Sequence, residues 1–327
     1  MYRGIRICDL HNHVLLRMTY LATDRIRGGG EHVHRNRSRR IALERLIAGA
    51  VDLMVFTIYL PFRYPWSSFM DAYRWSVDSF HAFIDDSRGA IAHAGSLSDI
   101  IHAWEHDRIA AVLAVEGGHV LDGSIRNVEV LAGDKVLYLT LTHFLQNELA
   151  ATSTLLPLTP DTGLLEFGRD VLCALGEHGI LADLSHCSPR SFTQACAQKR
   201  TQVIVSHTGL HRLRRVRRNL TTDQMEMLAA RQGVIGTIFF PPYMAPGAMK
   251  DGPGAVVKQI RHVIDLCGST IPAIGSDFDA SPFSCRGLEN VSRFPSLIDR
   301  LLDEFPYATV AAVMGGNLLS LLQRTRW

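Results

Sequence analysis

The feature that most constrains the fold is a series of eight short apolar runs rich in β-branched residues. Each run is almost continuously apolar instead of alternating between apolar and polar residues. This is typical of parallel strands that are covered on both faces of a sheet. The predicted strands are 5–10, 51–60, 109–115, 135–142, 179–185, 202–206, 233–240 and 271–276.

Segments with helical periodicity lie between most of these runs. Two of them carry clear start signals: Ser188 followed by Pro189, and the capping box formed by Thr221 and Gln224. The predicted helices are 41–48, 71–86, 97–107, 165–178, 189–199, 221–232, 255–266 and 294–305. Strands that alternate with helices in this way predict a (β/α)8 barrel, with an open doubly wound sheet as the alternative. No glycine-rich phosphate loop follows any strand, which argues against a nucleotide-binding sheet.

Length and composition agree with one barrel domain over residues 1–327, although 327 residues would also allow two domains. Hydrophobic residues make up 47% of the chain, and the formal charge of +2 is too small to indicate nucleic acid binding.

Basic residues gather at 25–40 and 211–218, either as solvated loop charges or as an attractive surface for anions. The long predicted loops, which in a barrel form the walls of the active site, are 17–40, 61–70, 144–163 and 241–254.

The cellular location is predicted from what the sequence lacks. The N-terminus has no apolar signal core, and no apolar run approaches the roughly 18 residues needed to span a membrane. The six cysteines show no Cys-x-x-Cys spacing and lie mostly in apolar surroundings, as reduced thiols do. We therefore predict a cytoplasmic protein without a membrane partner. The sequence leaves the oligomeric state open, a homodimer included.

Polar residues follow six of the predicted strands at the end where barrel enzymes carry their active sites. Taken singly, each could be a structural histidine or a loop carboxylate, but together they are difficult to assign to packing. They are His11 and His13, Glu116, His143, His186, His207 and Asp277.

Imidazole and carboxylate suit zinc, and also other first-row metals. Five ligands, His11, His13, Glu116, His186 and His207, exceed the needs of one tetrahedral zinc. Two ions roughly 3.5–4 Å apart with Glu116 between them would use them all, and a hydroxide between the ions would be the nucleophile.

The chain resembles the membrane (renal) dipeptidase family of the amidohydrolase superfamily. The matching stretches run in family order over nearly the whole chain and are DLHNH, AVEGGHVL, LYLTLTHFLQNELAATS, GILADLSHCSPRSF, VIVSHTGLHRL, RRNLTTDQMEMLAARQGVIGTIFFPP, AIGSDFD and MGGNLLSLL. The resemblance implies a barrel with two zinc ions that hydrolyses dipeptides. It implies that His11 and residue 13 bind one metal, His186 and His207 the other, and Glu116 both.

The resemblance also implies roles for three further residues. His143 would polarise the scissile carbonyl, Arg218 in RRNL would hold the substrate carboxylate, and Asp277 would be the acid/base. On composition alone, Arg218 would be one solvated charge in a basic run. The substrate would be a dipeptide or a related amide with a free carboxylate.

One position departs from the family pattern. The family usually has His-x-Asp in its first motif, whereas this chain has His13 where the aspartate belongs. By formal count the site, with its hydroxide and Asp277, then keeps a charge of about +1, which favours an anionic substrate. The change leaves two other functions open. One is a metal-dependent amidase or lactonase that acts on a specialised metabolite, and the other is a non-catalytic binding protein on the same scaffold.

Overall fold

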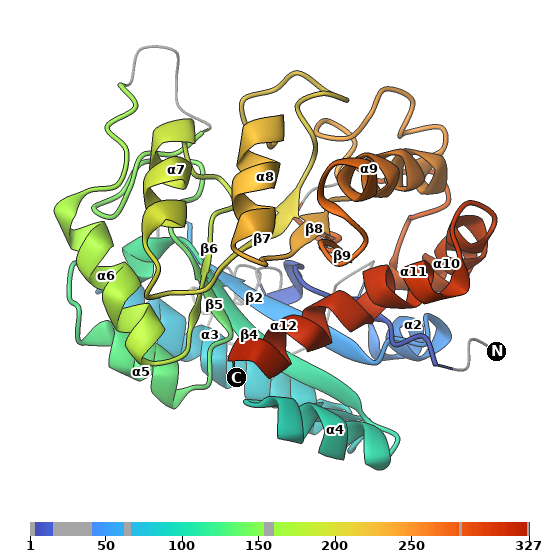
Figure 1. Ribbon diagram of the computed structural model, residues 1–327. Coiled ribbons are helices and arrows are strands. Elements are labelled where there is room, and N and C mark those ends of the chain that lie inside the picture. The colour runs from blue at the N-terminus through green and yellow to red at the C-terminus, as the bar shows by residue number, and fades with distance from the viewer. Residues whose placement is uncertain (1–3, 16–40, 62–66, 154–159, 281–282, 326) are drawn as a thin grey trace.

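The computed structural model describes residues 4–15, 41–61, 67–153, 160–280, 283–325 and 327, which form a parallel barrel surrounded by helices (Figure 1). The strand order around the barrel is β1-β2-β4-β5-β6-β7-β8-β9. These strands are β1 (Cys8–Asp9), β2 (Leu53–Tyr59), β4 (Ile109–Glu116), β5 (Tyr138–Thr140), β6 (Leu181–Asp183), β7 (Val203–Thr208), β8 (Ile235–Thr237) and β9 (Pro272–Ile274). The first and last strands meet where the Leu10 amide donates to the Ile274 carbonyl at 2.9 Å. The predicted (β/α)8 barrel is confirmed.

Each of the eight predicted runs overlaps one barrel strand. Six strands are shorter than predicted, whereas β4 and β7 extend past the predicted ends of their runs. The run 233–240, for example, contains only the three residues of β8. Beyond Thr237 the regular pairing with β9 ends: the Ile238 amide donates to the carbonyl of Thr208, the last residue of β7, and the Phe239 amide to the carbonyl of Ser276, past the end of β9. The sequence analysis missed β3 (Ile91–His93), which pairs with β4 outside the barrel path. Three residues are too few to carry a periodic signal.

The helices lie outside the strands, and those predicted from capping signals begin as expected. Ser188 accepts a hydrogen bond from the Ser191 amide, and Thr221 forms its capping box with Gln224. The helices are α2 (Leu43–Ala48), α3 (Phe69–Asp86), α4 (Leu97–Glu105), α5 (Asn127–Gly133), α6 (Glu166–Glu177), α7 (Pro189–Ala197), α8 (Thr222–Ala230), α9 (Gly252–Cys267), α10 (Phe294–Leu302), α11 (Tyr307–Ala311) and α12 (Asn317–Thr325). Of these, α5, α11 and α12 were not predicted, and a π-helical turn, Ala312–Gly316, joins the last two.

Several predictions concern features that the described residues test only in part. The loop 17–40, with its basic run 25–40, lies outside the described residues. All six cysteines are free thiols, as predicted. In the part of the chain that is described, no helix has both the length and the apolar character required to cross a bilayer. The single domain over 1–327, the cytoplasmic location and the homodimer stay predictions.

Candidate metal centre

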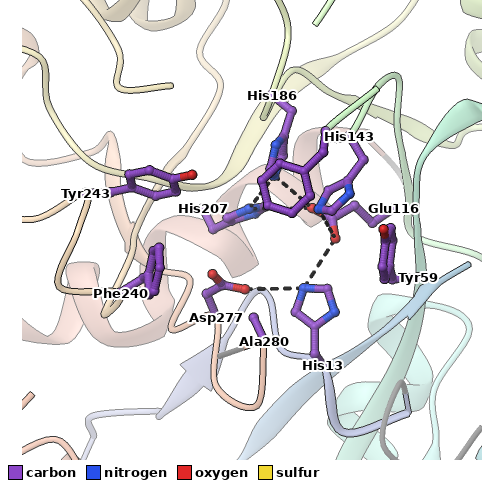
Figure 2. A pocket seen from close by; sticks show the side chains of 11 residues that line it. His13, Tyr59, Glu116, His143, His186, His207, Phe240, Tyr243, Asp277 and Ala280 are labelled. Carbon is purple, nitrogen blue, oxygen red and sulfur yellow. Dashed lines mark hydrogen bonds and ion pairs between the residues drawn. The ribbon is translucent and has the colours of Figure 1, made fainter. Parts of the chain in front are cut away.

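The barrel brings the seven polar residues at its strand ends to one place, and Figure 2 shows all of them except His11. His11 and His13 follow β1, Glu116 is the last residue of β4, and His207 belongs to β7. His143, His186 and Asp277 each lie three residues beyond their strand, β5, β6 and β9. Six of the seven residues are buried, and the side chain of Asp277 is 10% exposed. Parallel strands end at the same edge of a barrel, which is why residues so distant in sequence meet here.

The carboxylate of Glu116 lies at the centre of this group. Its Oε1 atom is 3.1 Å from His186 Nε2 and 3.5 Å from His207 Nε2. Its Oε2 atom is 3.2 Å from His13 Nε2. His11 Nε2 and His143 Nε2 lie farther out, at 3.7 Å from Oε1 and 3.7 Å from Oε2 respectively. One carboxylate thus faces two sets of imidazoles, one with each oxygen.

The imidazoles form two pairs, each with its Nε2 atoms close together. His11 and His13 are 3.2 Å apart, and His186 and His207 are 3.1 Å apart. Neither oxygen of Glu116 accepts a hydrogen bond of normal geometry from the described residues, although both are buried. A buried carboxylate without donors is costly unless a cation compensates for it. The donor set therefore fits divalent metal ions, and three combinations of these residues are compact enough to hold one.

The hydroxyl group of Tyr138 orients the imidazole ring of His11. Tyr138 Oη donates its single hydrogen to the Leu10 carbonyl at 3.0 Å and lies 2.8 Å from His11 Nδ1. It must therefore accept the proton of His11 Nδ1, and the lone pair of Nε2 points towards the centre. Metal-binding histidines are commonly fixed by such a bond on the ring nitrogen that does not bind the metal.

Burial and charge determine the protonation of the imidazoles. Burial, reinforced by nearby cationic groups, lowers the pKa of four of them, which keeps these rings neutral: His11, His143, His186 and His207. Burial alone would also lower the pKa of His13, but Asp277 and Glu116 on either side of it raise its pKa to about 10. Burial raises the pKa of Glu116. Without metal, a proton on His13 neutralises part of the carboxylate charge that cations would otherwise neutralise.

Asp277 faces His13 across the pocket, with its Oδ1 atom 3.3 Å from His13 Nε2. Its backbone is in the left-handed region, with φ of 59°, and that of His186 is also left-handed, with φ of 65°. Such conformations are strained for residues with a side chain, and they collect at functional sites. The Asp277 amide donates to the His11 carbonyl at 2.9 Å, which joins the two loops.

Arg218 is buried beside His207 and does not itself line the pocket, although His207 does. Its Nη2 atom lies 2.8 Å from His207 Nε2 and 2.9 Å from the His207 carbonyl. Its guanidinium carbon is 5.9 Å from the ring centre of Tyr243. Arg218 is therefore next to the centre, as predicted, but in this structure it donates to one of the predicted metal ligands. Whether it holds a substrate carboxylate stays a prediction.

The pocket above the centre has aromatic walls that the sequence analysis did not predict. Four aromatic side chains line it together with the polar residues: Tyr59, Phe144, Phe240 and Tyr243. Tyr59 packs against His143, with ring centres 4.2 Å apart, and Phe144 against the same ring at 4.1 Å. Phe144 is 49% exposed, which places it at the rim. The pocket thus has a polar floor and apolar sides (Figure 2).

Comparisons with known proteins identify the family of the chain. The sequence profile for membrane dipeptidase (peptidase family M19) matches residues 1–326. The chain belongs to the membrane dipeptidase family. An uncharacterized dipeptidase of Schizosaccharomyces pombe is 32% identical over 232 residues, which are 69% of this chain and 56% of that protein. Dipeptidase aclJ of Aspergillus oryzae is 30% identical over 251 residues, 75% of this chain and 59% of that one. This chain therefore spans less than two thirds of the length of these two members of the family.

A solved metallopeptidase structure supports the fold. The metallopeptidase from Rhodobacter sphaeroides, crystallised with a phosphinate mimic of the dipeptide L-Ala-D-Ala, superposes with a TM-score of 0.84. The two chains are 19% identical, and 99% of each is covered. At this identity the comparison establishes a shared barrel and leaves the reaction to be argued from the site.

The sequence analysis did not identify the buried residues that hydrogen-bond to the candidate ligands or to the segments that carry them. They include Tyr138, Asp9 and Asp183, all buried. Asp9 accepts hydrogen bonds from the amide and hydroxyl of Ser276, which ties β1 to the loop that carries Asp277. Each of the three is a polar residue inside an apolar run, and this signal was available in the sequence.

Proposed function

We propose that this chain is a metal-dependent dipeptidase that hydrolyses the peptide bond of dipeptides at a site for two divalent metal ions. Membership of the membrane dipeptidase family supports this activity at the level of the family. The observation that carries the proposal is the position of Glu116, whose buried oxygens lie among four histidine side chains and accept no hydrogen bond from the described residues. A carboxylate so placed suits a ligand shared by two cations.

The proposed ligands divide between the two cations. By the family resemblance, His11 and His13 would hold one, His186 and His207 the other, and Glu116 both; the Nε2 atoms of the two pairs lie 3.2 and 3.1 Å apart. Neutral imidazoles with a carboxylate suit zinc best, since zinc accepts nitrogen and oxygen ligands in a tetrahedral arrangement. When bound, the metal ions would supply Lewis acidity for the substrate carbonyl and lower the pKa of a bound water.

The remaining roles belong to residues of the chain itself. His143, kept neutral by burial, would donate through Nε2 to the carbonyl oxygen as negative charge develops there. Asp277 would take a proton from the attacking water and return it to the departing amine. Arg218 would turn from His207 to the substrate carboxylate, which it can bind through two parallel hydrogen bonds.

The pocket walls support a preference within dipeptides. Tyr59, Phe240 and Tyr243 contribute ring surface, so a side chain that enters the pocket buries apolar area. Glu116 and Asp277 are the carboxylates of the pocket lining, and both have assigned roles. We therefore expect dipeptides with apolar side chains to be hydrolysed better than those with acidic ones, and we expect the anion that the charge of the metal site favours to be the free carboxylate of the dipeptide.

The test combines metal analysis with a substrate panel. The purified protein, freed of metal with a chelator and reloaded with Zn²⁺, would be assayed on apolar and acidic dipeptides. Both stereochemical forms of Ala-Ala belong in the panel, because the Rhodobacter sphaeroides protein was solved with an L-Ala-D-Ala mimic. We expect two ions per chain and hydrolysis that is lost with the metal. Metal uptake without hydrolysis of any dipeptide would favour the amidase or lactonase. Failure to bind metal would favour the non-catalytic binding protein.

A further inference from the structure

A buried carboxylate lies behind the histidine pair His186 and His207. Asp183, at the end of β6, is fully buried and accepts hydrogen bonds on both oxygens. Oδ1 accepts from the Ser206 amide at 2.8 Å and from the amide and hydroxyl of Ser185 at 3.0 and 2.8 Å. Oδ2 accepts from Thr140 Oγ1 and Ser206 Oγ, both at 2.6 Å. One carboxylate thus joins the ends of β5, β6 and β7, the strands that lead to His143, His186 and His207.

Counting protons along this network determines the form of His207. Ser206 Oγ has one hydrogen, which it donates to Asp183, because a carboxylate can only accept. Ser206 Oγ also lies 2.9 Å from His207 Nδ1, so it must accept the proton of that nitrogen. On the other side of the ring, Arg218 can only donate, so His207 Nε2 accepts its hydrogen bond. The hydrogen bonds with Ser206 and Arg218 therefore require that His207 carries its proton on Nδ1 and a lone pair on Nε2.

We infer that Asp183 is a positioning residue for the metal site. Acting through Ser206, it fixes the proton of His207 on Nδ1 and so leaves the Nε2 lone pair, which accepts from Arg218 in this structure, to serve as the metal ligand. This inference rests on the proposed function, because it concerns the cation that His186 and His207 would bind. The negative charge of Asp183 also lies close to the pair His186 and His207, and this charge favours the binding of a cation there. A hydrogen-bonded partner of this kind typically contributes 10–100-fold to metal affinity.

The network offers a matched control for a purely structural role. Ser206→Ala removes the link between Asp183 and His207. Thr140→Val removes an equally short hydrogen bond to the same oxygen of Asp183 but does not interrupt the link to His207. If Asp183 serves only to hold strands together, the two variants should behave alike. Asp183→Asn tests the carboxylate itself, and Ser206→Ala decides if that variant does not fold.

The experiment measures metal binding and the state of His207 without using activity. Zn²⁺ affinity would be measured by chelator competition, and histidine ¹⁵N NMR spectra would be recorded on metal-free protein. We expect Ser206→Ala to weaken binding of one of the two ions by about 10–100-fold. The His207 nitrogen signals should also lose their Nδ1–H pattern, whereas Thr140→Val should leave both close to wild type.

Wild-type affinity and spectra in Ser206→Ala would overturn the inference, as would equal loss of affinity in Thr140→Val. These results are distinct from a failure of the proposed function. If the variants behave as expected but the wild-type protein hydrolyses no dipeptide, the positioning role stands and the dipeptidase assignment falls. If the wild-type protein takes up no Zn²⁺, both are overturned.

Discussion

Replacing Glu116 with glutamine removes a charge from the centre while almost preserving its shape. In the proposed site, this carboxylate contacts both cations. At an effective dielectric constant of about 20, a divalent cation and a carboxylate about 4 Å apart attract each other by about 8 kcal/mol. Desolvation of the two ions opposes much of this attraction. Breaking one buried pair typically costs about 3–5 kcal/mol, so we expect Glu116→Gln to weaken each metal by about 10²–10⁴-fold.

The metal-free protein should respond very differently. The glutamine would have the same neighbours as Glu116, including His13 Nε2, which lies 3.2 Å from Glu116 Oε2 and 3.3 Å from Asp277 Oδ1. Asp277 would remain to balance a proton on His13. The free energy of unfolding in the presence of chelator should therefore change by only about 1 kcal/mol.

The assay for Glu116→Gln measures metal content at buffered Zn²⁺ concentrations and chemical denaturation with chelator present. Glu129→Gln, at an exposed position on α5, is the control and should bind metal like the wild type. Two ions bound with wild-type affinity in Glu116→Gln would refute the role of Glu116 as the shared ligand. If Glu116→Gln lost its metal and its metal-free form also failed to fold, Glu116 would be needed for the fold as well as for metal binding, and our expectation for the metal-free protein would be wrong.

Three further variants test the other roles. Asp277→Asn should retain metal but lower kcat by orders of magnitude, because an amide cannot accept and return the proton; full turnover would exclude the acid/base role. Arg218→Ala should raise KM for dipeptides by about 10–100-fold, with a smaller change in kcat, because a charged hydrogen-bond donor is lost; an unchanged KM would exclude the carboxylate contact. Tyr138→Phe removes the hydroxyl that accepts from His11 and should weaken metal binding by about 10–100-fold in a chelator competition. Wild-type affinity in Tyr138→Phe would mean that the barrel backbone alone orients His11.

The barrel was predictable because its signals are local and repeated. Continuous apolar runs indicate buried parallel strands, and the helix at Thr221 begins where its capping residues predict. Elements that lack such signals were missed. The strand β3 has three residues, and α5 has seven and no side-chain cap at its start. Their conformations depend on the strands and helices against which they pack.

The candidate centre was predictable to a similar degree, for the same topological reason. Once the strands are parallel and close into a barrel, residues that follow them meet at one end, so Glu116 and the histidines were expected to lie together. Their convergence needed no knowledge of side-chain geometry. The aromatic walls were not predicted, because Tyr59 and Phe240 look like ordinary strand residues in the sequence.

The sequence by itself therefore determined which residues gather at the mouth of the barrel, since strand order and strand direction follow from local pattern. Only the tertiary structure decided how each of them is held. The hydrogen bonds between Tyr138 and His11 and between Asp183 and Ser206, and the contact of Arg218 with His207, join residues from 11 to 127 positions apart. Hydrogen bonds act over about 3 Å, so these partners emerge only when the packed barrel brings them together.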